Sequence, residues 1–146
     1  MAKRKVVNTD NLSGTTDGAK LLHVIVYDSK GSQQVDAENG TFVSVGGLVD
    51  GEEEALKATV IADGDSTAKM VALVASEEIL YDERLTIEDF YNKAGTIARA
   101  YLLQAGDRFS IKNGKDATIG TPITVGTVTL NPVKKKADGF ITYLVQ

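Results

Sequence analysis

The chain has 146 residues, of which 42% are hydrophobic and 25% are charged, a composition typical of a folded globular domain and too apolar for general disorder. Cysteine is absent and histidine occurs once, which excludes disulfide frameworks, thiol catalysis and histidine metal clusters within one chain. The net charge of −4 argues against broad electrostatic binding to nucleic acid, and the apolar runs are far shorter than the ~20 residues that a membrane-spanning helix needs.

The first element is a polar segment, residues 1–20, which we expect to form a flexible arm outside the folded body. It carries too few sizeable apolar side chains to offset the entropy lost on ordering. Near its start, three cations stand beside two β-branched residues and so combine positive charge with strand propensity. Two interpretations remain open: a tail without a role, or an arm that orders on a partner. For the second, the candidate partner-binding residues are Lys3, Arg4, Lys5, Val6 and Val7.

Residues 21–146 read as a single β-rich domain of about eight short strands. Apolar and β-branched residues fill each predicted strand, and turn-forming residues separate nearly all of them. A series of short strands of this kind predicts a sandwich or a barrel. The predicted strands cover residues 21–27, 41–45, 55–61, 70–75, 96–104, 108–112, 123–130 and 140–145.

One segment, residues 86–95, is instead predicted to form a short α-helix. Thr86 is a suitable N-cap with Asp89 three residues later, and Gly95 can end the helix in the left-handed conformation. Apolar residues between these positions repeat at helical spacing, so the helix would close one end of the β core. The expected fold class is therefore all-β with one short helix and a flexible N-terminal arm.

The sequence contains no convincing catalytic or cofactor motif. Four acidic residues, Glu77, Glu78, Asp82 and Glu83, lie close together but lack the spacing of a calcium-binding EF-hand. Phosphate-binding glycine loops and the nucleophile-elbow motif are also absent. His23 lies in an apolar predicted strand and is more simply explained as a structural or surface residue than as a base. We therefore expect no enzyme activity, no cofactor and no metal.

Two stretches of the sequence resemble a known class of protein. The first is EEILYDER with DFYNKAGTIARAYLLQAGDRFSI, within residues 74–112, and the second is the earlier NGTFVSVGGLVDGE. They are similar to small proteins encoded among the head genes of tailed bacteriophages, identified as head decoration proteins. The resemblance implies non-enzymatic binding to the outer surface of an assembled shell of major capsid protein, which the bound protein stabilises. It also implies a place on the virion, with neither nucleic acid nor membrane as partner, and either a monomer or a trimer of copies on the shell.

Other functions stay open. A carbohydrate- or cell-surface-binding module would need exposed aromatic side chains, for which the candidates are Tyr27, Tyr81, Tyr91 and Tyr143. An enzyme would use the acidic group described above to bind a divalent ion. An oligonucleotide-binding barrel is disfavoured by the negative charge and by an aromatic content of only 6%. The three lysines at 134–136 are predicted to lie on a solvated hairpin edge that discourages aggregation.

Overall fold

The computed structural model describes residues 5–8, 21–49, 55–62, 65–76, 91–112, 118–137 and 139–146. Over these residues the protein is all-β, as predicted, with a closed barrel and a separate sheet, and it contains no helix. The strands are β1 (Val6–Asn8), β2 (Leu21–Tyr27), β3 (Phe42–Leu48), β4 (Leu56–Val60), β5 (Val71–Val74), β6 (Ala98–Leu102), β7 (Arg108–Lys112), β8 (Ile123–Val125), β9 (Val128–Lys135) and β10 (Phe140–Val145).

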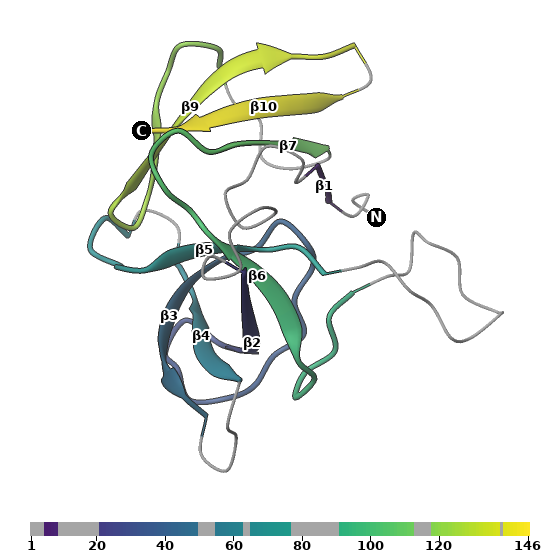
Figure 1. The fold of residues 1–146 in the computed structure, drawn as a ribbon, viewed down its shortest axis with the longest axis vertical. Coiled ribbons are helices and arrows are strands. Elements are labelled where there is room, and N and C mark those ends of the chain that lie inside the picture. Colours follow the sequence, from purple (N-terminus) through teal and green to yellow (C-terminus); the bar gives the residue numbers. More distant parts are fainter. Residues whose placement is uncertain are drawn as a thin grey trace, which may run out of the picture.

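The barrel closes in the order β2-β4-β3-β5-β6 and forms the lower layer in Figure 1. β2 and β4 run parallel, whereas the other neighbouring pairs are antiparallel. A barrel of so few strands has a narrow interior, so inward positions favour small and β-branched side chains. Its buried interior includes Val24, Val26, Val43, Ala58, Ala72, Val74, Ala98 and Ala100.

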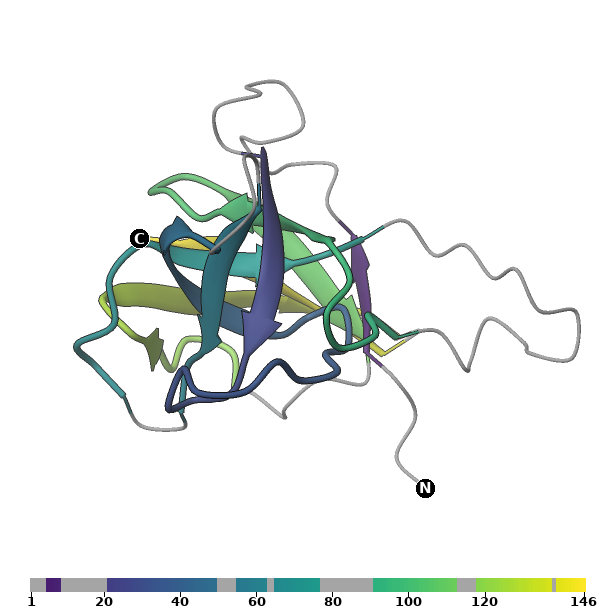
Figure 2. The ribbon, with the colours of Figure 1, turned by 90° about the horizontal axis from the view of Figure 1, so that it is seen from below.

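The sheet has the order β1-β7-β10-β9-β8, is antiparallel throughout, and covers one side of the barrel (Figures 1 and 2). Its inner face packs on the barrel through aromatic rings. Phe109 stacks on Tyr143 with 5.5 Å between their ring centroids. The ring centroid of Phe109 also lies 6.0 Å from that of Phe42, which belongs to the barrel. Aromatic pairs at such separations add to the stability gained from burial alone. A second apolar core therefore lies between the two layers.

The strand β5 connects these two cores. All four of its residues are buried, because alternate side chains face opposite sides of a strand. Val71 and Leu73 belong to the core between the layers, whereas Ala72 and Val74 point into the barrel. The uninterrupted apolar sequence of β5 is thus explained by burial on both faces.

The helix predicted over 86–95 is not seen. Of that segment only residues 91–95 are described, and they form an isolated bridge and a turn; the rest lies outside the described residues. The backbone N–H of Asn92 donates to the carbonyl of Ala37 at 2.7 Å, and the reverse bond is 2.9 Å long. Gly95 does adopt a positive φ, +81°, but within a turn and not at a helix end. Long-range pairing overrides the local helix signals here.

The single strand predicted over 123–130 is in fact two strands. Gly126, with φ +56°, turns the chain between β8 and β9. β9 then continues through Asn131 and Pro132, beyond the predicted strand end at residue 130. Pro132 has no backbone N–H to donate to the β9–β10 ladder. It is tolerated because the register between β9 and β10 shifts beside it, and a residue at such a bulge can leave a ladder hydrogen bond unmade.

Candidate functional site

The predicted partner-binding segment lies in part on the sheet. Val6 pairs with Lys112 and Val7 with Ile111, so these residues form an edge strand, β1, beside β7. The backbone N–H of Lys5 donates to the carboxylate of Glu38 at 3.1 Å. The structure thus brings together Lys5, Val6 and Val7 at one sheet edge. The other two predicted residues, Lys3 and Arg4, lie outside the described residues.

β1 differs from the detached arm that the sequence analysis expected for this part of the chain. Val6 and Val7 do form a strand, β1, in agreement with their strand propensity. This strand pairs with β7 of the same chain and not with a partner protein. Val7 is half-buried and packs against the core between the layers. Within the described residues, β1 has a strand neighbour on one side only. Its second edge is therefore where a further strand would add.

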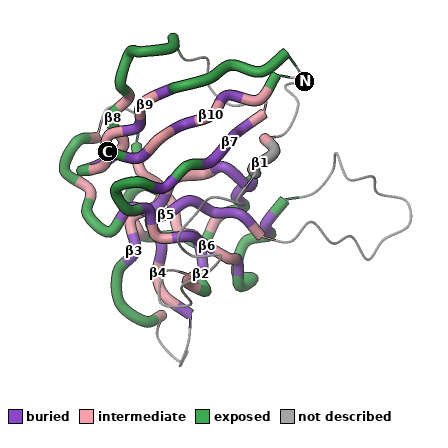
Figure 3. The backbone as a smooth tube through the Cα atoms, turned by 45° about the horizontal axis from the view of Figure 1, so that its top comes forward, coloured by how far each residue is buried: buried purple, intermediate pink, exposed green. Residues whose placement is uncertain are grey.

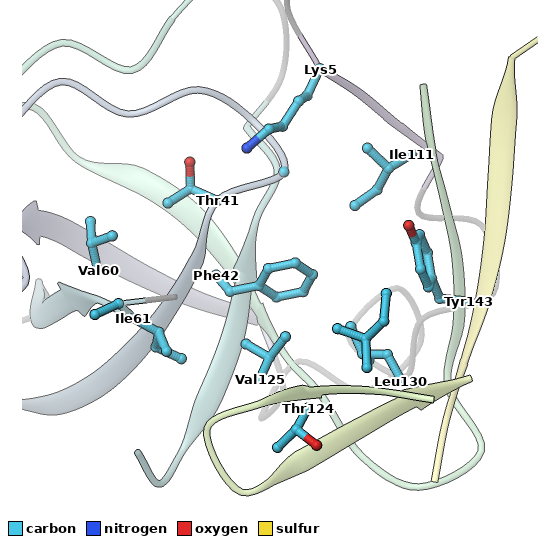
Figure 4. Close-up of a pocket in the computed structure, with 13 residues that line it drawn as sticks. Lys5, Thr41, Phe42, Val60, Ile61, Ile111, Thr124, Val125, Leu130 and Tyr143 are labelled. Atoms are coloured by element: carbon cyan, nitrogen blue, oxygen red, sulfur yellow. The ribbon is translucent and has the colours of Figure 1, made fainter. Parts of the chain in front are cut away.

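A cavity of about 280 Å³ lies between the barrel and the sheet, next to this strand. Figure 4 shows Phe42 projecting into it from the barrel, opposite Tyr143 of the sheet, with the Lys5 ammonium near its rim. The aliphatic stem of Lys5 lies over the backbone of Gly40, where a Cβ atom would stand only 3.0 Å from Lys5 Cδ. The described residues that line it are mainly aliphatic and aromatic, with Lys5 and Tyr143 as the titratable groups among them.

Two described aspartates, Asp28 and Asp65, accept hydrogen bonds from backbone N–H groups of their own turns. The backbone N–H of Ser32 is the largest influence on Asp28 and lowers the pKa of that carboxyl. The backbone N–H and the hydroxyl of Thr67 likewise lower the pKa of Asp65. Hydrogen bonds to an ionised carboxylate favour its charged form, so both groups act as turn caps.

The other candidates for chemistry are not assembled in the described part of the chain. The acidic group Glu77, Glu78, Asp82 and Glu83 lies outside the described residues. The described residues contain no cluster of histidine and carboxylate side chains that could hold a metal ion, nor a helix able to cross a membrane. His23 is exposed on β2 and pairs with Arg99 of the neighbouring barrel strand β6.

The tyrosines considered for sugar binding lie in dissimilar environments. Tyr143 is buried between the layers, and the ammonium of Lys57 lies 4.7 Å from the centroid of the half-buried Tyr27 ring. Tyr91, at 49% exposure, is the most exposed of the described tyrosines, and Tyr81 lies outside the described residues. No specific observation therefore favours the carbohydrate-binding alternative.

Comparison with protein-family models, with curated protein sequences and with solved structures finds no match.

Sequence reasoning missed one arrangement, on the side of the sheet that faces away from the barrel. Lys112 pairs with Phe140, and Thr142 pairs with Lys134, so β7, β10 and β9 carry these side chains on one face. The signal was present in the sequence as two-residue alternation, since Arg108, Ser110 and Lys112 alternate with apolar residues. Which strands are neighbours depends on long-range pairing, which the alternation alone does not give.

Proposed function

We propose that this protein is a non-enzymatic head decoration protein of a tailed bacteriophage. In this proposal it binds the outer surface of the assembled major capsid protein shell and stabilises it, on the virion and in the host cytoplasm during assembly. The observation that carries the proposal is the N-terminal strand β1, which lies at the sheet edge with only β7 beside it among the described strands. The resemblance within residues 74–112 supports the same class.

The edge strand supplies a specific mode of attachment. Its backbone N–H and C=O groups on the side away from β7 can form a ladder with an extended segment of the shell protein. The adjacent cations Lys3, Arg4 and Lys5 would favour a segment or surface that carries carboxylates. Such a contact is short, because β1 has 3 residues.

The rest of the chain suits a rigid body that binds without chemistry. One apolar core fills the barrel and a second joins the barrel to the sheet, so little conformational entropy would be lost on docking. A shell presents many equivalent sites, and weak contacts become effective when neighbouring copies also touch each other. Further copies of the chain are thus possible secondary partners, as monomers or trimers on the shell.

Co-sedimentation with assembled heads that lack the protein tests this function. The full chain is expected to pellet with heads and to saturate at a fixed number of copies per shell. A chain that begins at residue 9, checked for folding by circular dichroism, is expected to remain in the supernatant. If the full chain also stays in the supernatant, the proposed function is wrong. If both chains bind equally well, the edge-strand mechanism is wrong although the function stands.

The position of the gene gives an independent check. Adjacent genes for a portal, a head protease and a major capsid protein are expected. A gene set for envelope polysaccharide synthesis beside it would instead favour the carbohydrate-binding alternative, which an array of glycans would then test.

A further inference from the structure

The face of the sheet that points away from the barrel has a composition distinct from the inner face. On β10, Ile141, Tyr143 and Val145 are buried against the barrel, whereas the alternate residues are half-buried on the opposite side. Register places residues of β7 and β9 on that same side. We call these residues the outer sheet face: Arg108, Ser110, Lys112, Asn131, Lys134, Phe140, Thr142 and Leu144.

The charge of the outer sheet face is positive although the chain as a whole is acidic. The outer sheet face carries Arg108, Lys112 and Lys134 and no aspartate or glutamate, whereas Lys135 pairs with the inward-facing Ile141. The chain as a whole has a net charge of −4. Lys134 and Lys135 are both exposed, and one end of β9 is coloured as exposed in Figure 3.

Among the described residues, Asp107 is the one acidic residue that adjoins these strands in the sequence. Asp107 immediately precedes β7, but it is 3% exposed and accepts a hydrogen bond from the backbone N–H of Gln104 at 2.9 Å. Asp138 belongs to the turn between β9 and β10 and lies outside the described residues. Three lysines, at 134–136, precede it in the same hairpin.

Apart from its cations, the outer sheet face carries two apolar residues, Phe140 and Leu144, and three uncharged polar residues, Ser110, Asn131 and Thr142. The Lys112 ammonium lies 5.9 Å from the centroid of the Phe140 ring, and its stem passes beside Gly139. The hydroxyls of Ser110 and Thr142 hydrogen-bond to each other at 2.9 Å. Ser110 and Thr142 thus satisfy each other within the chain, and the charge of the face comes from Arg108, Lys112 and Lys134.

We propose that the outer sheet face docks on an acidic patch of the assembled shell, with Lys112 and Lys134 as its main cations. The proposal rests on the proposed function and adds the second surface of the attachment. Charge complementarity identifies the partner surface as rich in aspartate and glutamate. The face is also continuous with the edge strand, because Val6 of β1 pairs directly with Lys112.

A nucleic acid fits this face less well. Stacking on the bases of a single strand requires several aromatic side chains in neighbouring strands. Phe140 is the one aromatic residue of the outer sheet face.

Charge reversal with a matched control tests the proposal. The Lys112→Glu/Lys134→Glu double variant is compared with Lys69→Glu/Lys93→Glu, which reverses two exposed lysines in loops of the barrel layer. Binding to purified heads is measured by co-sedimentation. The first variant should lose affinity by roughly tenfold or more, and the second by no more than about twofold. A Lys112→Arg/Lys134→Arg variant should retain binding, which excludes damage to the fold as the cause.

The outcomes separate the docking surface from the function. Equal binding of both reversed variants by heads that bind the full chain overturns the outer sheet face and leaves the proposed function intact. Failure of the unaltered chain to bind heads overturns both. A short DNA duplex provides a third arm: tight binding of the duplex at physiological salt, lost in the Lys112→Glu/Lys134→Glu variant, would assign the face to nucleic acid and overturn the acidic protein partner.

Carbodiimide coupling gives a second readout that does not depend on affinity. This reagent joins an amine to a carboxylate in direct contact, so mass spectrometry of treated heads should find Lys112 or Lys134 linked to a shell aspartate or glutamate. Linkage found only from Lys69 and Lys93 would place the contact on the barrel and contradict the proposal.

Discussion

Asn39 is a buried polar residue that ties together distant parts of the barrel layer. Its side-chain oxygen accepts from the backbone N–H of Ser76 at 2.9 Å and from the Asn92 side-chain amide at 3.1 Å. Its own amide donates to the Ser76 carbonyl at 2.9 Å. Residues 77–90 lie outside the described residues, and Asn39 therefore joins the two described segments that flank them in the sequence.

Replacing this residue should therefore be costly. Asn39→Ala leaves buried donors and acceptors without partners, and we expect a loss of roughly 2–4 kcal/mol in the free energy of unfolding. Urea denaturation followed by circular dichroism measures it. Gln33→Ala, at an exposed position in the preceding loop, is the control and should change stability by less than about 0.5 kcal/mol. Similar values for the two variants would contradict the role assigned to Asn39.

Gly126 is required by the turn between β8 and β9. Its φ is +56°, and an added Cβ would lie 2.5 Å from the carbonyl oxygen of Ala68. We expect Gly126→Ala to destabilise the protein by about 2 kcal/mol or more, because both backbone strain and a clash with main chain arise. Gly47→Ala is a matched control: an added Cβ there meets no atom within 4 Å, and the change in melting temperature should be small. Equal effects of the two substitutions would refute this explanation.

Asp65 makes folding sensitive to acid. Its pKa in the folded protein lies below its usual value, chiefly because of hydrogen bonds from Thr67, so its ionised form favours the folded state. That contribution is complete above the pKa of the unfolded chain and disappears as the pH falls through the lower folded-state pKa. Between about pH 5 and pH 2, the unaltered protein should therefore lose more stability than Asp65→Asn, which keeps the acceptor oxygen but does not ionise. Parallel pH profiles for the two proteins would show that the hydrogen bonds do not favour the carboxylate.

At the scale of elements, β10 is the best-supported strand of the sheet. It pairs along its length with β7 on one side and with β9 on the other, whereas β1 and β8 have 3 residues each and lie at the two ends of the sheet. Hydrogen-bonded amides of β10 should exchange with solvent at least about a hundredfold more slowly than those of β1. Hydrogen-exchange mass spectrometry measures this and also tests the predicted mobility of the arm. Protection in β1 equal to that in β10 would contradict the prediction.

Most strands could be predicted because their local signals agree with the fold. The predicted ranges 21–27, 108–112 and 140–145 coincide with β2, β7 and β10, where runs of apolar or alternating residues are bounded by turns. The predictions failed where a distant contact decided the outcome. Asn92 pairs with Ala37, which is distant in the sequence, and is not helical. The residues next to Asn92 in the sequence give no signal of this pairing.

The candidate site was predictable only in part, for the same reason. Val6 and Val7 carry strand propensity that a local reading detects, but the identity of the neighbouring strand is a long-range property. The outer sheet face was still harder to predict from the sequence. Lys112 and Phe140 are separated by 28 residues in sequence and become neighbours only through the pairing of β7 with β10.

At the scale of the whole molecule, the two layers have different relations to a partner. The barrel layer has an interior filled with valine and alanine, and the sheet lies over one of its sides. The sheet carries the edge strand and the cationic outer face, so both proposed contacts lie on the same layer. In this account the sheet meets the shell and the barrel faces outward.

Cryo-electron microscopy of heads incubated with the protein tests this account most directly. We expect added density on the outer surface of the shell at symmetry-related positions, with the sheet toward the shell and the barrel away from it. Heads without added density, or with the protein only inside the shell, would contradict the proposed function.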